Sequence, residues 1–300
     1  MNFIQNKSSK ILSKVVKSFL IGTSLLTLST FTERVKANTP PVCKDVLGTY
    51  NSETKVHSFT ATQIANANID FCTQTPERFQ MKIFELGLCA GLPIGVSDDP
   101  KTFNKTNCVA TMISANGVDA DIRNTTVALP SAPSRPPSNT YTHAYIIIEN
   151  TFGLRGSIKI NDGNGGVHQY CSKGEPDPGD ATAAAASCVA SNHEEELDNF
   201  DDDPDFDPYF PPHTMNGGGQ VSALLTTDDT SSAAGNKDVV TRLIGVFDTN
   251  SGTAVVITDK TSGLEMQLSV EDVGYGLGFS NAGVPNDFGS MPFKPIFNTF

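Results

Sequence analysis

Residues 141–149 read YTHAYIIIE, and this stretch decides the fold class. Its centre is apolar at successive positions, so both faces of an extended segment would be apolar there. A strand of this kind lies inside a sheet that is covered on both sides. The sequence therefore predicts a buried central strand at residues 141–149.

A second strand signal lies upstream. Residues 79–83 (FQMKI) alternate apolar and polar side chains, and residues 84–88 (FELGL) alternate in the opposite phase. One extra residue in a strand reverses which face its side chains occupy. We therefore expect a β-bulge near Ile83.

A hairpin follows the central strand. Residues 155–160 and 167–171 flank the loop NDGNGG at 161–166. Asn, Asp and Gly in such a short connection are typical of a turn between paired strands.

The C-terminal third predicts three more strands, at 239–247, 253–258 and 264–270, with turns at 248–252 and 259–263. Short turns between successive strands predict an antiparallel meander. Helical patterns are scarce. We expect about two turns within 61–69 and one within 194–199.

The expected fold class is mainly β, an antiparallel β-sandwich or two packed β regions held by disulfides, with a long acidic loop. Four regions are predicted along the chain. They are a signal peptide (1–37), an N-terminal disulfide-stapled β region (38–190), an acidic and Gly-rich linker or loop (191–220), and a C-terminal antiparallel β region with an extended tail (221–300).

The first region has the pattern of an export signal. Lys7, Lys10, Lys14 and Lys17 precede an apolar run at 19–31, and VKA at 35–37 suits signal peptidase. A transmembrane anchor is the alternative, but a run of 13 residues is shorter than a bilayer crossing needs. We expect a secreted, periplasmic or cell-surface protein with no transmembrane segment in the mature chain.

The charge balance excludes some partners. The 300 residues include 21 Lys and Arg and 33 Asp and Glu, a formal net charge of −12. Residues 1–37 hold six basic residues and one acidic residue, so their removal makes the net charge −17. A chain this acidic repels phosphate, and we expect no nucleic-acid partner.

All six cysteines follow residue 37, and an even count in an oxidising compartment predicts disulfides. We favour pairing of neighbours: Cys43 with Cys72, Cys89 with Cys108, and Cys171 with Cys188. A metal cluster is the competing interpretation, because His168 and His193 lie near the last pair.

The acidic run contains the only cofactor candidate. Asp203, Asp205 and Asp207 alternate, and carboxylates at this spacing suit Ca²⁺. An EF-hand loop begun at Asp203 fails, because Pro208 and Thr214 stand where Gly and Glu are required. A solvated acidic loop is the alternative to a calcium site, and no other cofactor is expected.

Catalytic motifs are missing from the sequence. Residues 193–197 begin like the zinc-protease motif HExxH, but Leu197 replaces the second histidine. No GxSxG motif is present either.

The segment 273–279 (VGYGLGF) is the candidate interaction site. As a strand it places Tyr275 and Phe279 on one face, and Gly274, Gly276 and Gly278 on the other. A strip of glycines lets another backbone or bulky rings approach closely. The strip serves either internal packing or contact with another subunit.

These observations favour a non-enzymatic protein with a structural or adhesive role at the cell surface or in the extracellular space. The expected partner is a second copy of the chain or a surface component. A secreted glycan- or ligand-binding module is the alternative function, and a secreted hydrolase with dispersed carboxylates is the second alternative.

Overall fold

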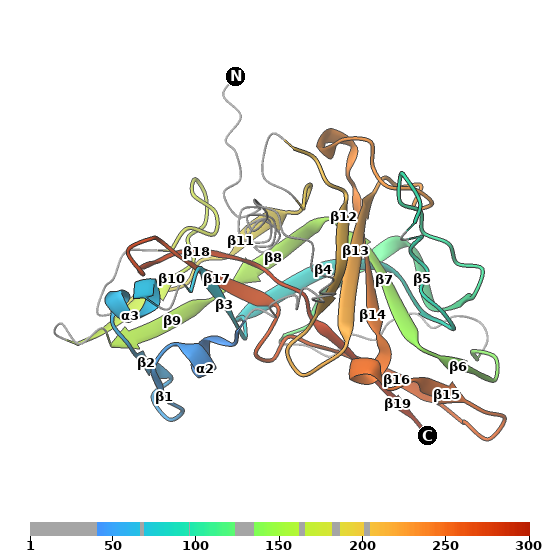
Figure 1. Cartoon of the computed structure of the whole chain (residues 1–300), viewed down its shortest axis with the longest axis horizontal. Coiled ribbons are helices and arrows are strands. Elements are labelled where there is room, and N and C mark those ends of the chain that lie inside the picture. The colour runs from blue at the N-terminus through green and yellow to red at the C-terminus, as the bar shows by residue number, and fades with distance from the viewer. Residues whose placement is uncertain are drawn as a thin grey trace, which may run out of the picture.

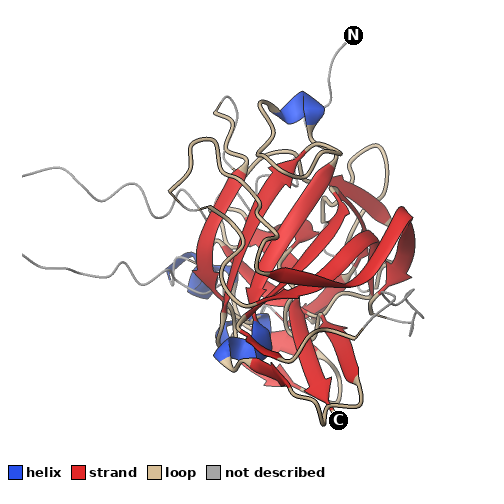
Figure 2. Cartoon of the chain, turned by 90° about the vertical axis from the view of Figure 1, so that its right-hand side faces the viewer, coloured by secondary structure: helices blue, strands red, loops and turns tan. Residues whose placement is uncertain are grey.

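A computed structural model describes residues 41–66, 69–95, 97–123, 135–161, 166–181, 187–200 and 205–300. The predicted signal peptide lies outside the described residues. Within them the chain is mainly β, with several sheets packed together and only two short α-helices, α2 (Cys43–Val46) and α3 (Ala61–Asn66). Figure 2 shows the strands in stacked layers, with the helices at the margins. The predicted fold class is confirmed.

The largest sheet has eight strands, all paired antiparallel. Their order is β11 (His193–Glu196), β8 (Thr151–Arg155), β4 (Arg78–Cys89), β7 (His143–Glu149), β14 (Arg242–Asp248), β13 (Gln220–Thr226) and β12 (Tyr209–Thr214), and β5 (Cys108–Asp121) also pairs with β4 (Figure 1). Strands that precede residue 190 and strands that follow residue 220 therefore share one sheet.

Strand β7 occupies the centre of this sheet. It pairs with β4 on one side and β14 on the other, and every residue from Ala144 to Ile148 is buried. The prediction of a central strand is confirmed, because only a strand covered on both faces can bury consecutive apolar side chains. The predicted bulge is confirmed as well: the register of β4 shifts between Ile83 and Glu85 against both neighbours.

A four-stranded sheet lies beside the large one, in the order β1 (Thr49–Asn51), β2 (Val56–Ser58), β9 (Ser157–Asn161) and β10 (Val167–Cys171). Strands β9 and β10 form the predicted hairpin, whose loop residues 162–165 lie outside the described ones. Strand β2 joins β9 in parallel, a pairing with no signal in the sequence.

The C-terminal third contains strands at the predicted places, but the predicted meander is wrong. Strand β15 (Val255–Ile257) pairs with β6 (Asn139–Tyr141), and β16 (Leu264–Ser269) pairs with the last strand, β19 (Lys294–Thr299). The 3₁₀ turn η2 (Thr249–Gly252) redirects the chain after β14. Its Asn250 side chain donates to the carbonyl of Phe297 at 3.0 Å and accepts from the Phe297 amide at 2.7 Å. This turn therefore binds the C-terminal strand instead of closing a hairpin.

A three-stranded sheet completes the fold, with β17 (Tyr275–Phe279) between β18 (Pro285–Ser290) and β3 (Phe71–Gln74). A short 3₁₀ helix, η1 (Lys237–Val239), precedes β14.

The main core lies between the sheets. Its buried side chains include Phe79 and Phe152 of the eight-stranded sheet, Ile158 of the four-stranded sheet and Leu277 of the three-stranded sheet, and Phe293 joins them from the chain just before β19.

The acidic stretch contains two strands, and the predicted helical turn at 194–199 is wrong. In β11 the side chains alternate: His193 and Glu195 are buried, whereas Glu194 and Glu196 face solvent. The period of two is therefore present, but the buried members are ionisable, so the apolar pattern that marks a strand is missing from the sequence.

All three disulfides join neighbouring cysteines, as predicted. Cys43 pairs with Cys72, Cys89 with Cys108 and Cys171 with Cys188, with Cα–Cα distances of 4.9, 4.0 and 6.1 Å. No cysteine is free. Three disulfides are typical of a protein that folds in an oxidising compartment. Among the described residues, no helix has the length and apolar character needed to span a bilayer.

Candidate functional site

A basic groove of about 990 Å³ lies where the four-stranded sheet meets β3, beside α2. Six of the 21 Lys and Arg residues precede residue 38, and five of the remaining 15 line this groove. They are Lys44, Lys55, Arg123, Arg155 and Lys159. Three acidic residues line it too, namely Glu77, Glu271 and Asp272. In a chain with a large excess of acid, this concentration of cations makes the groove the candidate functional site.

One wall of the groove is formed where strand β8 continues into strand β9. Figure 1 shows the two strands following one another in nearly the same direction. Alternate residues of an extended chain share a face, so Arg155, Ser157 and Lys159 form a row. Gly156 allows the chain to pass from one sheet to the next. A Cβ at this position would lie 2.2 Å from the ring of the buried Tyr275, so no larger residue fits without displacing that ring.

Glu77, in the segment between β3 and β4, bonds to two residues of this row. Its carboxylate lies 3.3 Å from Arg155 Nε and accepts a hydrogen bond from Ser157 Oγ at 2.6 Å. Its backbone amide donates to the Arg155 carbonyl at 2.8 Å. Gln169 Nε2, on the neighbouring strand β10, donates to Ser157 Oγ at 3.3 Å. The middle of the groove is therefore a fixed polar network.

Asp272 is also held in place. Lys44 Nζ forms an ion pair with the Asp272 carboxylate. The backbone of Asp272 is anchored to the chain that leaves β3, because its amide donates to Thr75 Oγ1 at 2.8 Å and its carbonyl accepts from Thr73 Oγ1 at 2.9 Å. Arg123 Nε donates to the carbonyl of Pro76 at 3.1 Å.

Lys55 and Lys159 form the uncompensated end of the groove. Lys159 lies opposite Val56 in the parallel pair of β2 and β9, so Lys55 is the next residue along. Both lysines are exposed, and neither makes an ion pair with a described acidic residue. Their charges are available to an anion from solution.

Two neutral polar side chains, His57 and Gln74, also belong to the groove lining. His57 is only 6% exposed, its ring lies 4.7 Å from that of Tyr50, and its Nδ1 has no hydrogen-bond partner among the described residues. Burial lowers the pKa of His57 to about 4, so the ring is neutral at physiological pH. Gln74 Nε2 is likewise buried with no such partner. Buried polar atoms normally have partners, and these two atoms have no exposed surface, so a molecule in the groove reaches them only after a local movement of the lining.

The predicted calcium ligands are only partly described. Asp203 lies outside the described residues. Asp205 is exposed, and its carbonyl accepts from Asn199 Nδ2 at 2.7 Å. Asp207 Oδ1 accepts from the Tyr209 amide at 2.9 Å and so fixes the start of β12. In the part of the chain that the structure describes, no three His, Cys, Asp or Glu side chains gather as metal ligands. Calcium binding stays a prediction.

The glycine strip is buried. Gly276 and Gly278 belong to β17, which is paired on both edges, and Gly274 precedes it with a φ of +78°. On the opposite face, Tyr275 stacks on Phe288 at 5.3 Å and Phe279 meets Phe59 edge-on at 6.3 Å. These are contacts within the chain, and a role in contact with another subunit stays a prediction.

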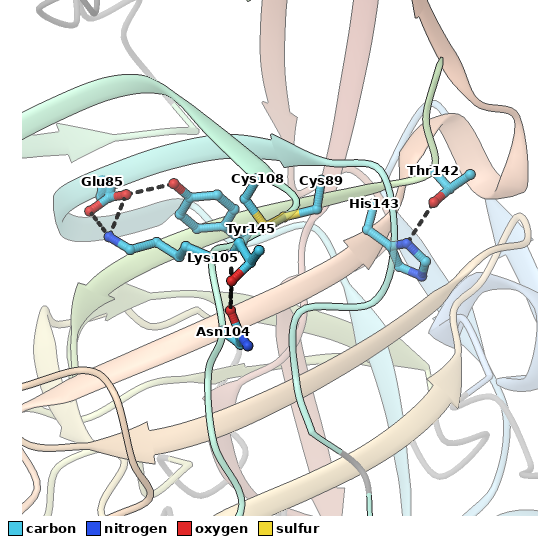
Figure 3. The surroundings of a disulfide bond; sticks show 9 residues. Glu85, Cys89, Asn104, Lys105, Cys108, Thr142, His143 and Tyr145 are labelled. Carbon is cyan, nitrogen blue, oxygen red and sulfur yellow. Dashed lines mark hydrogen bonds and ion pairs between the residues drawn. A yellow bond between two sulfur atoms is a disulfide. The ribbon is translucent and has the colours of Figure 1, made fainter. Parts of the chain in front are cut away.

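A second cluster of ionisable groups surrounds the Cys89–Cys108 disulfide (Figure 3). Tyr145 donates to Glu85 Oε1 at 2.5 Å, and Lys105 Nζ lies 3.0 Å from both Glu85 oxygens. Burial and the neighbouring Glu85 raise the pKa of Tyr145, so this phenol stays protonated. Glu85, Tyr145 and Lys105 bond to one another, which fits a structural role.

Comparison of the chain with models of known protein families, with curated proteins and with solved structures gives no significant match. The site therefore rests on its own geometry. The groove could not be predicted from the sequence, because its residues come from seven separate segments and no local motif joins them. The one local signal was the alternation of Arg155, Ser157 and Lys159 in a predicted strand.

Proposed function

We propose that the protein is exported and acts without catalysis as an adhesive binding protein, which attaches to an anionic ligand through the basic groove. The observation that carries this proposal is the concentration of five cations in one groove of a strongly acidic chain. A positive site in a negative molecule selects anions locally, while the remaining surface repels them.

Export is supported by the three disulfides and by the basic and apolar pattern of residues 1–37. The protein then acts outside the cytosol, as secreted, periplasmic or surface-attached material. Its acidity favours solubility and disfavours contact with anionic lipid.

Binding without turnover is supported by the state of the acids in the groove. Glu77 is engaged by Arg155 and Ser157, and Asp272 is paired with Lys44. Acid–base catalysis requires a carboxyl group that is free to exchange a proton with the substrate. Glu271 is the exposed carboxylate of the groove and is in no ion pair with a described residue, so the hydrolase alternative would have to use Glu271 or a carboxylate that these pairs release.

The test is a thermal-shift measurement of the purified, oxidised protein with a panel of anionic and neutral sugars and small anions. We expect the melting temperature to rise with anionic compounds only, and the rise to shrink as salt is added. In the double variant Lys55→Gln, Lys159→Gln the rise should be largely lost.

Lys237→Gln, Lys260→Gln is the matched control, because it removes the same charge from two exposed sites outside the groove. If the groove and control variants respond alike, or if no anion shifts the melt, the proposal is wrong.

A further inference from the structure

The groove is long relative to a single small anion. Its row of polar residues runs from Arg155 through Ser157 to Lys159, a distance of about 13 Å at roughly 3.3 Å per residue of extended chain. Arg123 lies near one end, since it and Arg155 both bond to the 76–77 segment. Lys55 lies at the other end, beside Lys159. Arg123 at one end and Lys55 with Lys159 at the other are thus separated by the Arg155–Glu77 ion pair and the neutral side chains bonded to it.

The middle suits a hydroxyl-rich ligand. Gln169, Gln74 and His57 belong to the lining there, together with Ser157, whose Oγ bonds to Gln169 and Glu77. The Tyr50 ring lies beside His57, tilted by 35°, and adds an aromatic ring to the lining. Such a surface exchanges hydrogen bonds with sugar hydroxyls and packs against the apolar face of a sugar ring.

The charge pattern disfavours a ligand with densely spaced charge. Duplex DNA carries one negative charge per roughly 1.7 Å, so its phosphates would also face Glu77, Glu271 and Asp272. A chain with about one carboxylate per sugar ring carries its charges less densely than the duplex, so fewer of them face the groove acids while two reach the cationic ends. The mixed groove is complementary to this lower charge density.

We propose that the groove binds an extended stretch of acidic polysaccharide, with one carboxylate at Lys55 and Lys159 and another near Arg123. This proposal rests on the function proposed above and names the ligand class of the same site. Binding at both ends at once makes the affinity for a chain exceed that for its monomer, because the second contact is intramolecular.

The probes are oligogalacturonate, galacturonate monomer, methyl-esterified oligogalacturonate and single-stranded DNA of similar length. Isothermal titration with the purified protein measures each affinity. We expect the acidic oligomer to bind at least tenfold more tightly than the monomer. The methyl ester, which keeps the shape but loses the charge, should bind at least tenfold more weakly than the acid.

Lys55→Gln, Lys159→Gln should weaken binding of the oligomer roughly tenfold, and Lys237→Gln, Lys260→Gln should leave it unchanged. Equal melting temperatures of both variants without ligand show that the fold is intact. If monomer and oligomer bind equally, or if DNA binds more tightly than the oligomer, the polysaccharide proposal is overturned while anion binding stands. If none of these probes binds but other anions raise the melting temperature, the polysaccharide proposal is likewise overturned and anion binding stands. If no anion binds at all, both proposals fall.

Discussion

Glu195 is a carboxyl group enclosed in the core. It is 1% exposed and accepts a hydrogen bond from the Ser290 amide at 2.5 Å. Burial raises its pKa to about 7, because the charged form loses its hydration. His193, two residues earlier on the same face of β11, has its pKa lowered to about 4 for the same reason. The two groups have opposite effects on stability as pH changes.

Between pH 4.5 and 7 the unfolded chain loses the Glu195 proton and the folded chain keeps it, so the stability from Glu195 is lost as pH rises through 7. His193 has the opposite effect. Its neutral ring stabilises the folded state above pH 6.5, and this contribution to the free energy of unfolding is lost as pH falls from 6.5 towards 4. Glu195→Gln removes only the first effect. We expect wild type and variant to unfold at similar denaturant concentrations at pH 5.

At pH 8 the Glu195→Gln variant should be more stable by up to roughly 3 kcal/mol. Urea unfolding between pH 5 and 8 measures the difference. Glu194→Gln, at the exposed neighbouring position, is the control and should follow the wild-type profile. A pH-independent difference for Glu195→Gln would show that Glu195 does not titrate in this range.

At the scale of elements, the turn η2 decides where the C-terminal strand goes. Asn250 has a φ of 41° and a ψ of 49°, in the left-handed region that Asn tolerates better than most residues. Its side chain exchanges two hydrogen bonds with the backbone of Phe297 in β19. One residue therefore supplies both the turn conformation and the attachment of the last strand.

Asn250→Ala should destabilise the protein by about 3 kcal/mol, since two hydrogen bonds and a favourable left-handed residue are lost together. Asn250→Gly keeps the backbone freedom and should cost about 2 kcal/mol. Urea unfolding gives both values, and amide exchange in residues 294–299 should increase in each variant. Unchanged exchange there would mean that β16 alone holds the strand.

At the scale of the whole molecule, the disulfides differ in what they support. Cys43–Cys72 attaches α2 to β3, and Cys43 itself lines the basic groove. Cys89–Cys108 joins the ends of β4 and β5, away from the groove. Each closes a loop of tens of residues, worth about 3 kcal/mol in the chain-entropy model.

Two double variants each remove one disulfide: Cys43→Ala with Cys72→Ala, and Cys89→Ala with Cys108→Ala. Each should lower the free energy of unfolding by about 3 kcal/mol. Only the first pair should weaken binding of oligogalacturonate, because it frees the groove wall that carries Lys44. Thermal melts and titration calorimetry of the two variants separate stability from binding. Equal loss of affinity in both would show that the groove depends on overall stability alone.

The features predicted correctly are those set by local physics. The consecutive apolar residues of β7, the phase change at Ile83 and the Gly-rich loop after β9 each act within a few residues of chain. Disulfide pairing between neighbours is local in the same sense, because short loops close at the lowest entropic cost. These signals sufficed for a mainly β, disulfide-stapled fold.

Tertiary structure decided the rest. The pairing of β16 with β19 depends on Asn250 reaching Phe297, and the burial of Glu195 depends on the Ser290 amide from a distant strand. The basic groove gathers Lys44, Lys55, Arg123, Arg155 and Lys159 from separate segments. Period and composition describe which face a residue takes along its own strand. Which strands meet depends on long-range packing, and charges distant in sequence form a site only when those strands lie side by side.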